Sequence, residues 1–190
     1  MKNINIGFAI TGSFCTFSKA IKEIENFISF GANVIPIMSY NAKSTDTRFG
    51  NAKDFIERIE SLTGNKVISE IKDAEPIGPE NMTDIMIVLP CTGNTLAKLA
   101  LGIYDTPVTL AVKSHLRNQK PVLIGVSSND SLSSSAKNIG ALLNYKHYYF
   151  VPMTQDDPIK KPFSIVCDFD KTYKAAEYAL RNQQIEPIIF

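Results

Sequence analysis

The sequence lacks several features that would place it in common protein classes. Its 190 residues include no apolar stretch long enough to span a bilayer, so we expect no membrane partner. The first residues, 1–6, lead directly into a strand pattern and do not resemble a signal peptide. The net charge is only +1 at pH 7, which gives no reason to expect nucleic acid or an anionic surface as partner.

Cysteine is scarce as well. The three cysteines, Cys15, Cys91 and Cys167, are widely spaced and form no CxxC pair. This disfavours a disulfide framework or a zinc site and predicts a reducing, cytoplasmic setting. None of the predicted loops presents a metal-binding cluster. The hydrophobic fraction of 44% is ordinary for a globular protein, and the length predicts one domain over residues 1–190.

What the sequence does contain is a regular alternation of strands and helices. Apolar runs predict strands at 5–10, 33–38, 84–89, 121–126 and 148–151, with a short extended piece at 163–167. Helical spacing predicts helices at 14–30, 52–63, 94–101, 107–118 and 132–143, and a last helix capped by Asp170. Residues 39–50 and 152–162 are predicted to be polar loops, and 66–80 is ambiguous. The alternation predicts a doubly wound, mainly parallel α/β sandwich with the first strand central.

The turn Pro90–Thr95 is the centre of the predicted site. It follows an apolar strand and enters a helix N-terminus, which is where ligands bind in open α/β sheets. The loops that follow the other strands open at the same edge and are rich in hydroxyls, amides or glycine: 11–13, 39 onward, 127–130 and 152 onward. Such residues suit a phosphate, which favours a nucleotide-like ligand. Helix caps and turns favour the same residue types and are the alternative interpretation.

Two nucleotide classes are disfavoured by what the first loop lacks. Ser13 stands where a P-loop has its phosphate-binding lysine, and Gly7 lies inside the strand. No GxGxxG follows that strand, so the usual NAD fingerprint is missing. A phosphate held by hydroxyls and backbone N–H groups, as for FMN, requires neither motif.

The segment Lys43–Arg48 places two cations among three hydroxyls. Arginine binds carboxylates in bidentate fashion and lysine adds a second charge, so this loop would suit a small dicarboxylate substrate. A solvated surface loop is the simpler interpretation. Lys160 and Lys161 could contribute from the last loop, or could pair with the neighbouring aspartates.

The sequence indicates no clear nucleophile or base. Cys91 lies near a helix N-terminus, but its place at the end of a buried strand favours an inert small residue. We expect Cys15 to face the packing of the first helix, His115 to lie on a surface turn and His147 to precede a strand. None of them is predicted to be catalytic.

The loop residues resemble those of the flavoprotein superfamily of FMN-dependent cysteine decarboxylases. The resemblance rests on Thr11-Gly12-Ser13, on Ser39, on Gly102, Asp105 and Thr109, and on Pro90-Cys91-Thr92-Gly93-Asn94-Thr95, which is similar to the family turn Pro-Ala-Ser-Ala-Asn-Thr. Within the superfamily the chain resembles the family of dipicolinate synthase B subunits. That finer resemblance rests on residues 41–50, Arg117-Asn118 before Pro121-Val122, Ser127 with Asn129-Asp130, 155–158 and 160–162.

The resemblance implies ligand contacts residue by residue. By position, Thr11, Gly12, Ser13 and Ser39 would hold the FMN phosphate, and Asn94 would orient a substrate carboxylate. The predicted cofactor contacts are Thr11, Gly12, Ser13, Ser39, Pro90, Thr92, Gly93, Asn94, Thr95, Ser127 and Asn129. The predicted substrate contacts are Lys43, Ser44, Thr45, Thr47, Arg48 and Asn94.

The resemblance also implies a role and partners. The A subunit of dipicolinate synthase would bind NAD(P), and the pair would oxidise a dihydrodipicolinate-type precursor to dipicolinate in the mother cell of a sporulating bacterium. Superfamily members assemble as trimers or dodecamers, which implies a homo-oligomer. One alternative is an FMN-dependent decarboxylase of a cysteinyl substrate, but those members use a histidine after the second strand and this chain has none before His115. The other is a non-catalytic scaffold for the A subunit.

Overall fold

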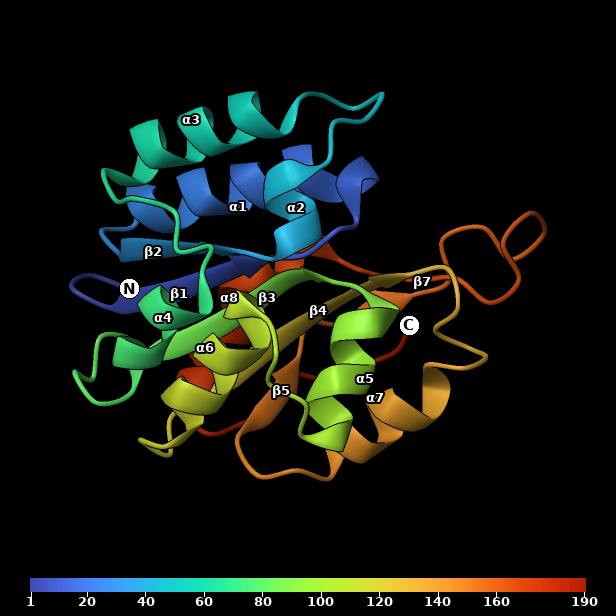
Figure 1. Ribbon diagram of the computed structural model, residues 1–190. Helices are drawn as coiled ribbons and strands as arrows, with labels where there is room; N and C mark the ends of the chain where they lie inside the picture. The colour runs from blue at the N-terminus through green and yellow to red at the C-terminus, as the bar shows by residue number, and fades with distance from the viewer.

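The computed structural model describes residues 1–190 and is built on a 7-stranded sheet. The parallel part consists of β2 (Asn33–Met38), β1 (Asn5–Ile10), β3 (Ile85–Cys91), β4 (Val122–Ser128) and β5 (Tyr148–Phe150), in that order (Figure 1). The first half of β4 pairs with β5, and its end pairs with the antiparallel strand β7 (Ile165–Cys167). A doubly wound, mainly parallel α/β fold is therefore confirmed.

The strand order puts the reversal of the chain between β1 and β3. From β1 the chain moves outward to β2, then returns to form β3 on the other side of β1. The first strand is thus an interior strand, but β3 occupies the middle of the sheet, so the expectation of a central first strand was wrong in that detail. The reversal leaves a crevice at the carboxyl ends of the strands, where ligands bind in such sheets.

Helices cover both faces of the sheet (Figure 1). One layer contains α1 (Phe17–Ser29), with α3 (Ala52–Thr63) and α8 (Thr172–Leu180) packed against it. The other contains α5 (Gly93–Leu101), α6 (Pro107–Leu116) and α7 (Ala136–Leu143). A single cluster of 46 buried apolar residues joins these layers through the sheet, and β3 is buried along its whole length.

Local signals account for most helix ends. Gly31 and Gly64 have φ angles of 80° and 68° and stop α1 and α3 in the left-handed conformation that glycine adopts at little cost. Thr106 and Thr109 form a reciprocal capping box around Pro107 at the start of α6. None of the helices combines the length and apolar character needed to cross a membrane.

Residues 39–50 are more ordered than their composition indicated. They contain the short helix α2 (Tyr40–Ser44), whose N-cap Ser39 accepts a hydrogen bond from the Ala42 amide at 3.3 Å. The ambiguous segment 66–80 forms a bridge between Ile68 and Ile37 on β2, followed by α4 (Ile71–Ala74) and the 3-10 turn η2 (Glu75–Ile77).

The C-terminal third departs further from prediction. Helix α7 begins at Ala136 rather than Leu132, because residues 128–135 wrap around the Asp130 side chain. The segment predicted as a rigid loop contains β6 (Met153–Thr154), which pairs with β7. The predicted cap Asp170 is also wrong: Asp168 accepts the capping bond and begins the 3-10 turn η3 (Phe169–Lys171), from which α8 continues.

Candidate functional site

The loops after β1 and β3 are joined at the base of the crevice. The Thr11 hydroxyl donates to the Pro90 carbonyl at 2.7 Å and accepts from the Thr92 amide at 3.0 Å. Thr11 is only 1% exposed. Its side chain therefore holds the turn after β3 in place, and the two bonds leave it little capacity to bind a ligand.

A second contact brings in the loop after β4. The Ser13 and Ser127 hydroxyls lie 2.8 Å apart, and Thr92 and Thr95 lie 3.2 Å apart across the first turn of α5. The structure therefore brings together predicted cofactor residues from three loops that are far apart in the sequence.

Two neighbouring cavities open at this edge and share Gly12 and Thr92. The first, of about 390 Å³, we call the Ser39 cavity. It is lined by Thr11, Gly12, Ser39, Tyr40, Asn41, Thr92, Asn94, Thr95, Lys98 and Thr106. Its lining contains a single cation, no carboxylate and many hydroxyl and amide groups, which is the environment an anion prefers.

The groups in the Ser39 cavity that are available to a ligand include Ser39 and Asn94. The Ser39 hydroxyl accepts a bond from the Ala42 amide and so keeps its own proton free to donate. The exposed Asn94 amide lines the same cavity and pairs with no protein group. Lys98 is held by Asp105 at 2.6 Å, which also keeps the pKa of that carboxyl below its usual range.

The second cavity, of about 470 Å³, we call the Arg48 cavity. Its lining includes the predicted residues Gly12, Ser13, Arg48, Thr92, Ser127 and Asn129. Its apolar wall is formed by Phe14, Phe49, Ile165 and Val166. The Arg48 guanidinium lies 4.9 Å from the Phe49 ring centre and pairs with no carboxylate, so it is free to bind an anion.

Asn94, the predicted substrate residue outside this loop, lines the Ser39 cavity, but the other predicted substrate residues of the Lys43–Arg48 loop line neither cavity. Lys43 is turned away and pairs with Glu70 and with the Ser69 hydroxyl at 3.2 Å. The Ser44 hydroxyl donates to the Tyr40 carbonyl at 2.7 Å. Thr45 caps the end of α2, and Thr47 pairs with Gly50 in a tight turn. Of the predicted loop, Arg48 alone reaches a cavity.

Pro90 and Gly93, predicted as cofactor contacts, lie beneath the surface of the site rather than on it. Both are buried, and neither lines a cavity. Lys98 reaches the Ser39 cavity from α5 and was not predicted from the sequence. The last loop reaches the Arg48 cavity, as considered for Lys161, and there Lys161 pairs with Asp156 at 2.9 Å, so both interpretations of these charges apply.

The titratable side chains are placed differently from expectation in two cases. Cys15 is exposed and lines the Arg48 cavity instead of packing under the first helix. His115 is fully buried instead of lying on a surface turn, and burial lowers its pKa to about 4. Cys91 is buried as predicted, and burial raises the pKa of its thiol, which makes it a poor nucleophile.

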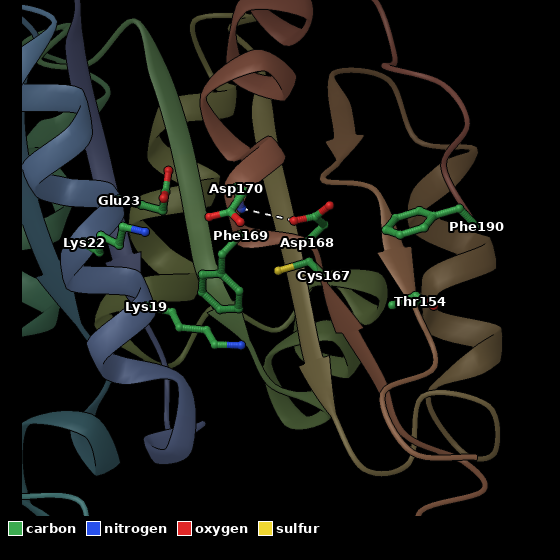
Figure 2. Close-up of a pocket in the computed structure, with 9 residues that line it drawn as sticks. All are labelled: Lys19, Lys22, Glu23, Thr154, Cys167, Asp168, Phe169, Asp170 and Phe190. Atoms are coloured by element: carbon green, nitrogen blue, oxygen red, sulfur yellow. Dashed lines mark hydrogen bonds between the residues drawn. The ribbon is translucent and has the colours of Figure 1, made fainter.

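A separate cavity of about 410 Å³ lies between α1 and η3 (Figure 2). It is lined by Lys19, Lys22, Glu23, Thr154, Cys167, Asp168, Phe169, Asp170 and Phe190. Burial raises the pKa of Glu23, which faces this space. None of the predicted site residues lines this cavity. No group of histidine, cysteine and acidic residues is arranged to hold a metal ion.

The two cavities at the carboxyl edge fit a flavin nucleotide in chemical character. The Ser39 cavity has the hydroxyls, amide and cation that suit a phosphate and a polyol chain. The Arg48 cavity adds aromatic and aliphatic side chains that suit a planar ring. At Gly12, which lines both cavities, an added Cβ would be in ordinary van der Waals contact with Asn41 and Phe14 at 3.7 Å.

This combination of a doubly wound sheet and a hydroxyl-rich crevice is that of a flavin-type nucleotide-binding fold, and comparison with known proteins agrees. The flavoprotein family model matches residues 1–179. The chain therefore belongs to the flavoprotein family, and within it to the group of dipicolinate synthase B subunits.

The relatives that carry this assignment are similar over their whole length. The dipicolinate synthase B subunit of Bacillus subtilis (strain 168) is 42% identical over 189 residues, covering 100% of this chain and 94% of that protein. The crystal structure of the dipicolinate synthase B subunit from Bacillus halodurans superposes with a TM-score of 0.91 at 36% identity, over 100% of this chain and 97% of that one. The FMN-dependent cysteine decarboxylase SpaF shares the fold, with a TM-score of 0.70 at 20% identity over 94% and 96% of the two chains.

Proposed function

We propose that this chain is the B subunit of a dipicolinate-forming oxidoreductase. It would act with an A subunit that carries NAD(P), to oxidise a dihydrodipicolinate-type precursor during sporulation. The observation that carries the proposal is the unpaired Arg48 guanidinium, which lines a cavity next to the anion-suited Ser39 cavity. A dicarboxylate substrate supplies the carboxylate that such an arginine binds. The full-length similarity to two dipicolinate synthase B subunits supports the same role.

FMN is part of this proposal. Ser39, Asn94 and Gly12 would hold its phosphate and polyol chain, and the apolar wall of the Arg48 cavity would contact its ring. When bound, FMN supplies an acceptor for the electrons removed from a substrate. The residues of this chain would orient the substrate carboxylate through Arg48 and would limit water at the ring through Phe14 and Phe49.

Decarboxylation of a cysteinyl substrate is less well supported. No histidine lines either cavity at the carboxyl edge. His115 is buried and bonded to Thr83 and to the Pro121 carbonyl, so it cannot reach a substrate at that edge. The general base that the decarboxylase relatives were expected to use therefore has no counterpart among the residues that line the site.

The proposal is tested by spectroscopy and by co-expression. We expect the purified chain to show a flavin absorption spectrum, or to acquire one with added FMN. Co-expression with an A subunit should yield dipicolinate, and Arg48→Ala should abolish its formation. Arg58→Ala is the matched control, because Arg58 lies on α3 and pairs with Glu25 away from the site.

Each outcome discriminates between the candidate functions. A colourless protein that takes up no FMN, yet stimulates the A subunit even as Arg48→Ala, would identify a scaffold. Release of CO₂ from cysteinyl peptides would identify a decarboxylase. Unchanged dipicolinate synthesis by Arg48→Ala would remove Arg48 from the site.

A further inference from the structure

Gly93, the first residue of α5, has no room for a side chain. A Cβ at this position would lie 2.6 Å from Oδ1 of Asp130, 2.6 Å from Oγ of Ser135 and 2.9 Å from Oγ of Ser128. Gly93 does not have a left-handed φ angle, so backbone conformation does not require glycine here. The requirement is spatial, and it is imposed by the Asp130 side chain and the serines around it.

The Asp130 carboxylate is itself firmly held. It accepts hydrogen bonds from the hydroxyls of Ser128, Ser134 at 2.5 Å and Ser135 at 3.1 Å. These bonds, led by the one from Ser128, hold the pKa of Asp130 below its usual range. The carboxylate also lies against the first turn of α5, where the helix dipole stabilises a negative charge.

The contact between Asp130 and Gly93 closes a ring of interactions among three loops. Thr11 joins the loop after β1 to the turn after β3. Ser13 and Ser127 join the loop after β1 to the loop after β4. The packing of Asp130 on Gly93 supplies the third side, between the loop after β4 and the turn after β3. Of the residues in this ring, Thr11, Ser13, Thr92 and Ser127 line the Ser39 or the Arg48 cavity.

We propose that Asp130 is a positioning residue that sets the spacing between these two cavities. Its carboxylate holds the Ser127–Asn129 loop against the N-terminus of α5, and so fixes Thr92 and Asn94 relative to Ser127. The same charge occupies the N-terminus of α5 from within the protein, so the anionic groups of a ligand are directed to Ser39 and Arg48 instead. The ligand part of this proposal rests on the proposed function, whereas the loop spacing does not.

The test uses second-site rescue. Gly93→Ala introduces a methyl group that collides with Asp130, so we expect amide hydrogen exchange at residues 92–95 and 127–130 to accelerate about tenfold or more. FMN affinity should fall by a similar factor. In the double variant Gly93→Ala/Asp130→Ala, Ser128 and Ser135 are no longer held by a carboxylate and can rotate away from the new methyl group. The double variant should therefore recover much of the amide protection and FMN affinity that Gly93→Ala loses. Asp130→Asn keeps the size and one acceptor oxygen and should stay near wild type in exchange.

The exchange measurement is made on the ligand-free protein and stands whether or not FMN binds. Protection of the β1 and β3 amides in the same spectra separates loop displacement from failure to fold. Asp54→Ala, an exposed aspartate on α3, is the control and should change neither readout. The proposal is overturned if the effects of Gly93→Ala and Asp130→Ala simply add, or if Asp130→Ala leaves exchange at 92–95 unchanged. Absence of FMN binding by wild type, with exchange as expected, would reject the flavin role alone.

Discussion

The two edges of the parallel sheet both carry polar side chains but use them in opposite ways. At the edge where the strands begin, His115 is buried with Nδ1 at 2.7 Å from the Thr83 hydroxyl and Nε2 at 2.9 Å from the Pro121 carbonyl. Lys120 lies at the same edge and donates to the Thr83 carbonyl at 2.7 Å. Each of these groups has a protein partner, so this edge is structural.

At the edge where the strands end, the polar groups divide into two kinds. Thr11, Ser13 and Asp130 bond within the protein and shape the crevice. Asn94 and Arg48 line the cavities without a protein partner. The comparison shows that polarity alone does not mark a ligand site, because what matters is whether the protein already satisfies the group. Substitutions on the two edges should therefore have different consequences for stability and for binding.

The largest effect is expected from protonation of His115. Its pKa is about 4 in the folded protein, below the usual value of 6.5, so the unfolded chain binds the proton more tightly. The stability this group contributes is fully present above pH 6.5 and is lost as the pH falls toward 4. We expect the loss to reach about 3 kcal/mol, measured by urea denaturation at a series of pH values.

A variant isolates this contribution from that of other groups. His115→Gln removes the titration, so its free energy of unfolding should depend less on pH between 6.5 and 4 than that of the wild type. His147→Asn is the comparison variant, since asparagine tolerates the φ of 72° at that position. Burial lowers the pKa of His147 as well, so this variant measures the part of the pH dependence that His147 contributes. Equal pH dependence in wild type and His115→Gln would show that the first edge does not rely on neutral His115.

The next effect is expected from Thr11 at the opposite edge. Thr11→Val removes a buried hydroxyl that serves both the Pro90 carbonyl and the Thr92 amide. We expect about 2 kcal/mol of destabilisation, because the Thr92 amide is left without a partner and the Pro90 carbonyl keeps only the 3.3 Å bond from the backbone amide of residue 11. FMN affinity should fall as well, since the turn after β3 loses its anchor. Thr45→Val, an exposed threonine, should change neither the unfolding free energy nor the affinity.

The smallest effect on stability, paired with a clear effect on binding, is expected from Arg48. Arg48→Ala should weaken dipicolinate binding about tenfold or more in calorimetry, because a charge-assisted bond is lost. Its unfolding free energy should change by less than about 0.5 kcal/mol. Lys43→Ala should change neither the dipicolinate affinity nor the unfolding free energy appreciably, because Lys43 forms a partly exposed ion pair with Glu70. If Lys43→Ala weakened dipicolinate binding more than Arg48→Ala, Lys43 rather than Arg48 would be the ligand-binding cation of that loop.

Most of the fold could be predicted because its signals are local. The strands at 5–10 and 33–38 and the helix at 52–63 have the predicted bounds, since apolar spacing and the stops at Gly31 and Gly64 act within a few residues. The late start of α7 could not be predicted in this way. Residues 132–135 have the composition of a helix start. However, the hydroxyls of Ser134 and Ser135 donate to Asp130, and Ser135 packs against Gly93.

The site could be predicted only in part. The loops that form it follow from the strand order, so the gathering of Gly12, Ser39, Asn94 and Ser127 at one edge was foreseeable. The outward turn of Lys43 was not, because its partner Glu70 lies in a segment without a clear pattern. Nor was the burial of His115, which has a polar sequence context but bonds to Thr83 in the loop before β3.

Short-range patterns and directly comparable motifs in the sequence are enough to predict the alternation of strands and helices, the loops that would meet and membership of the flavoprotein family. Which polar side chains stay free to bind a ligand depends on the three-dimensional packing. The reason is that their competing partners come from distant parts of the chain: Thr11 and Pro90 are 79 positions apart, and Ser13 and Ser127 are 114 apart. No local pattern records such a pairing, and each pairing that forms removes one candidate from the site.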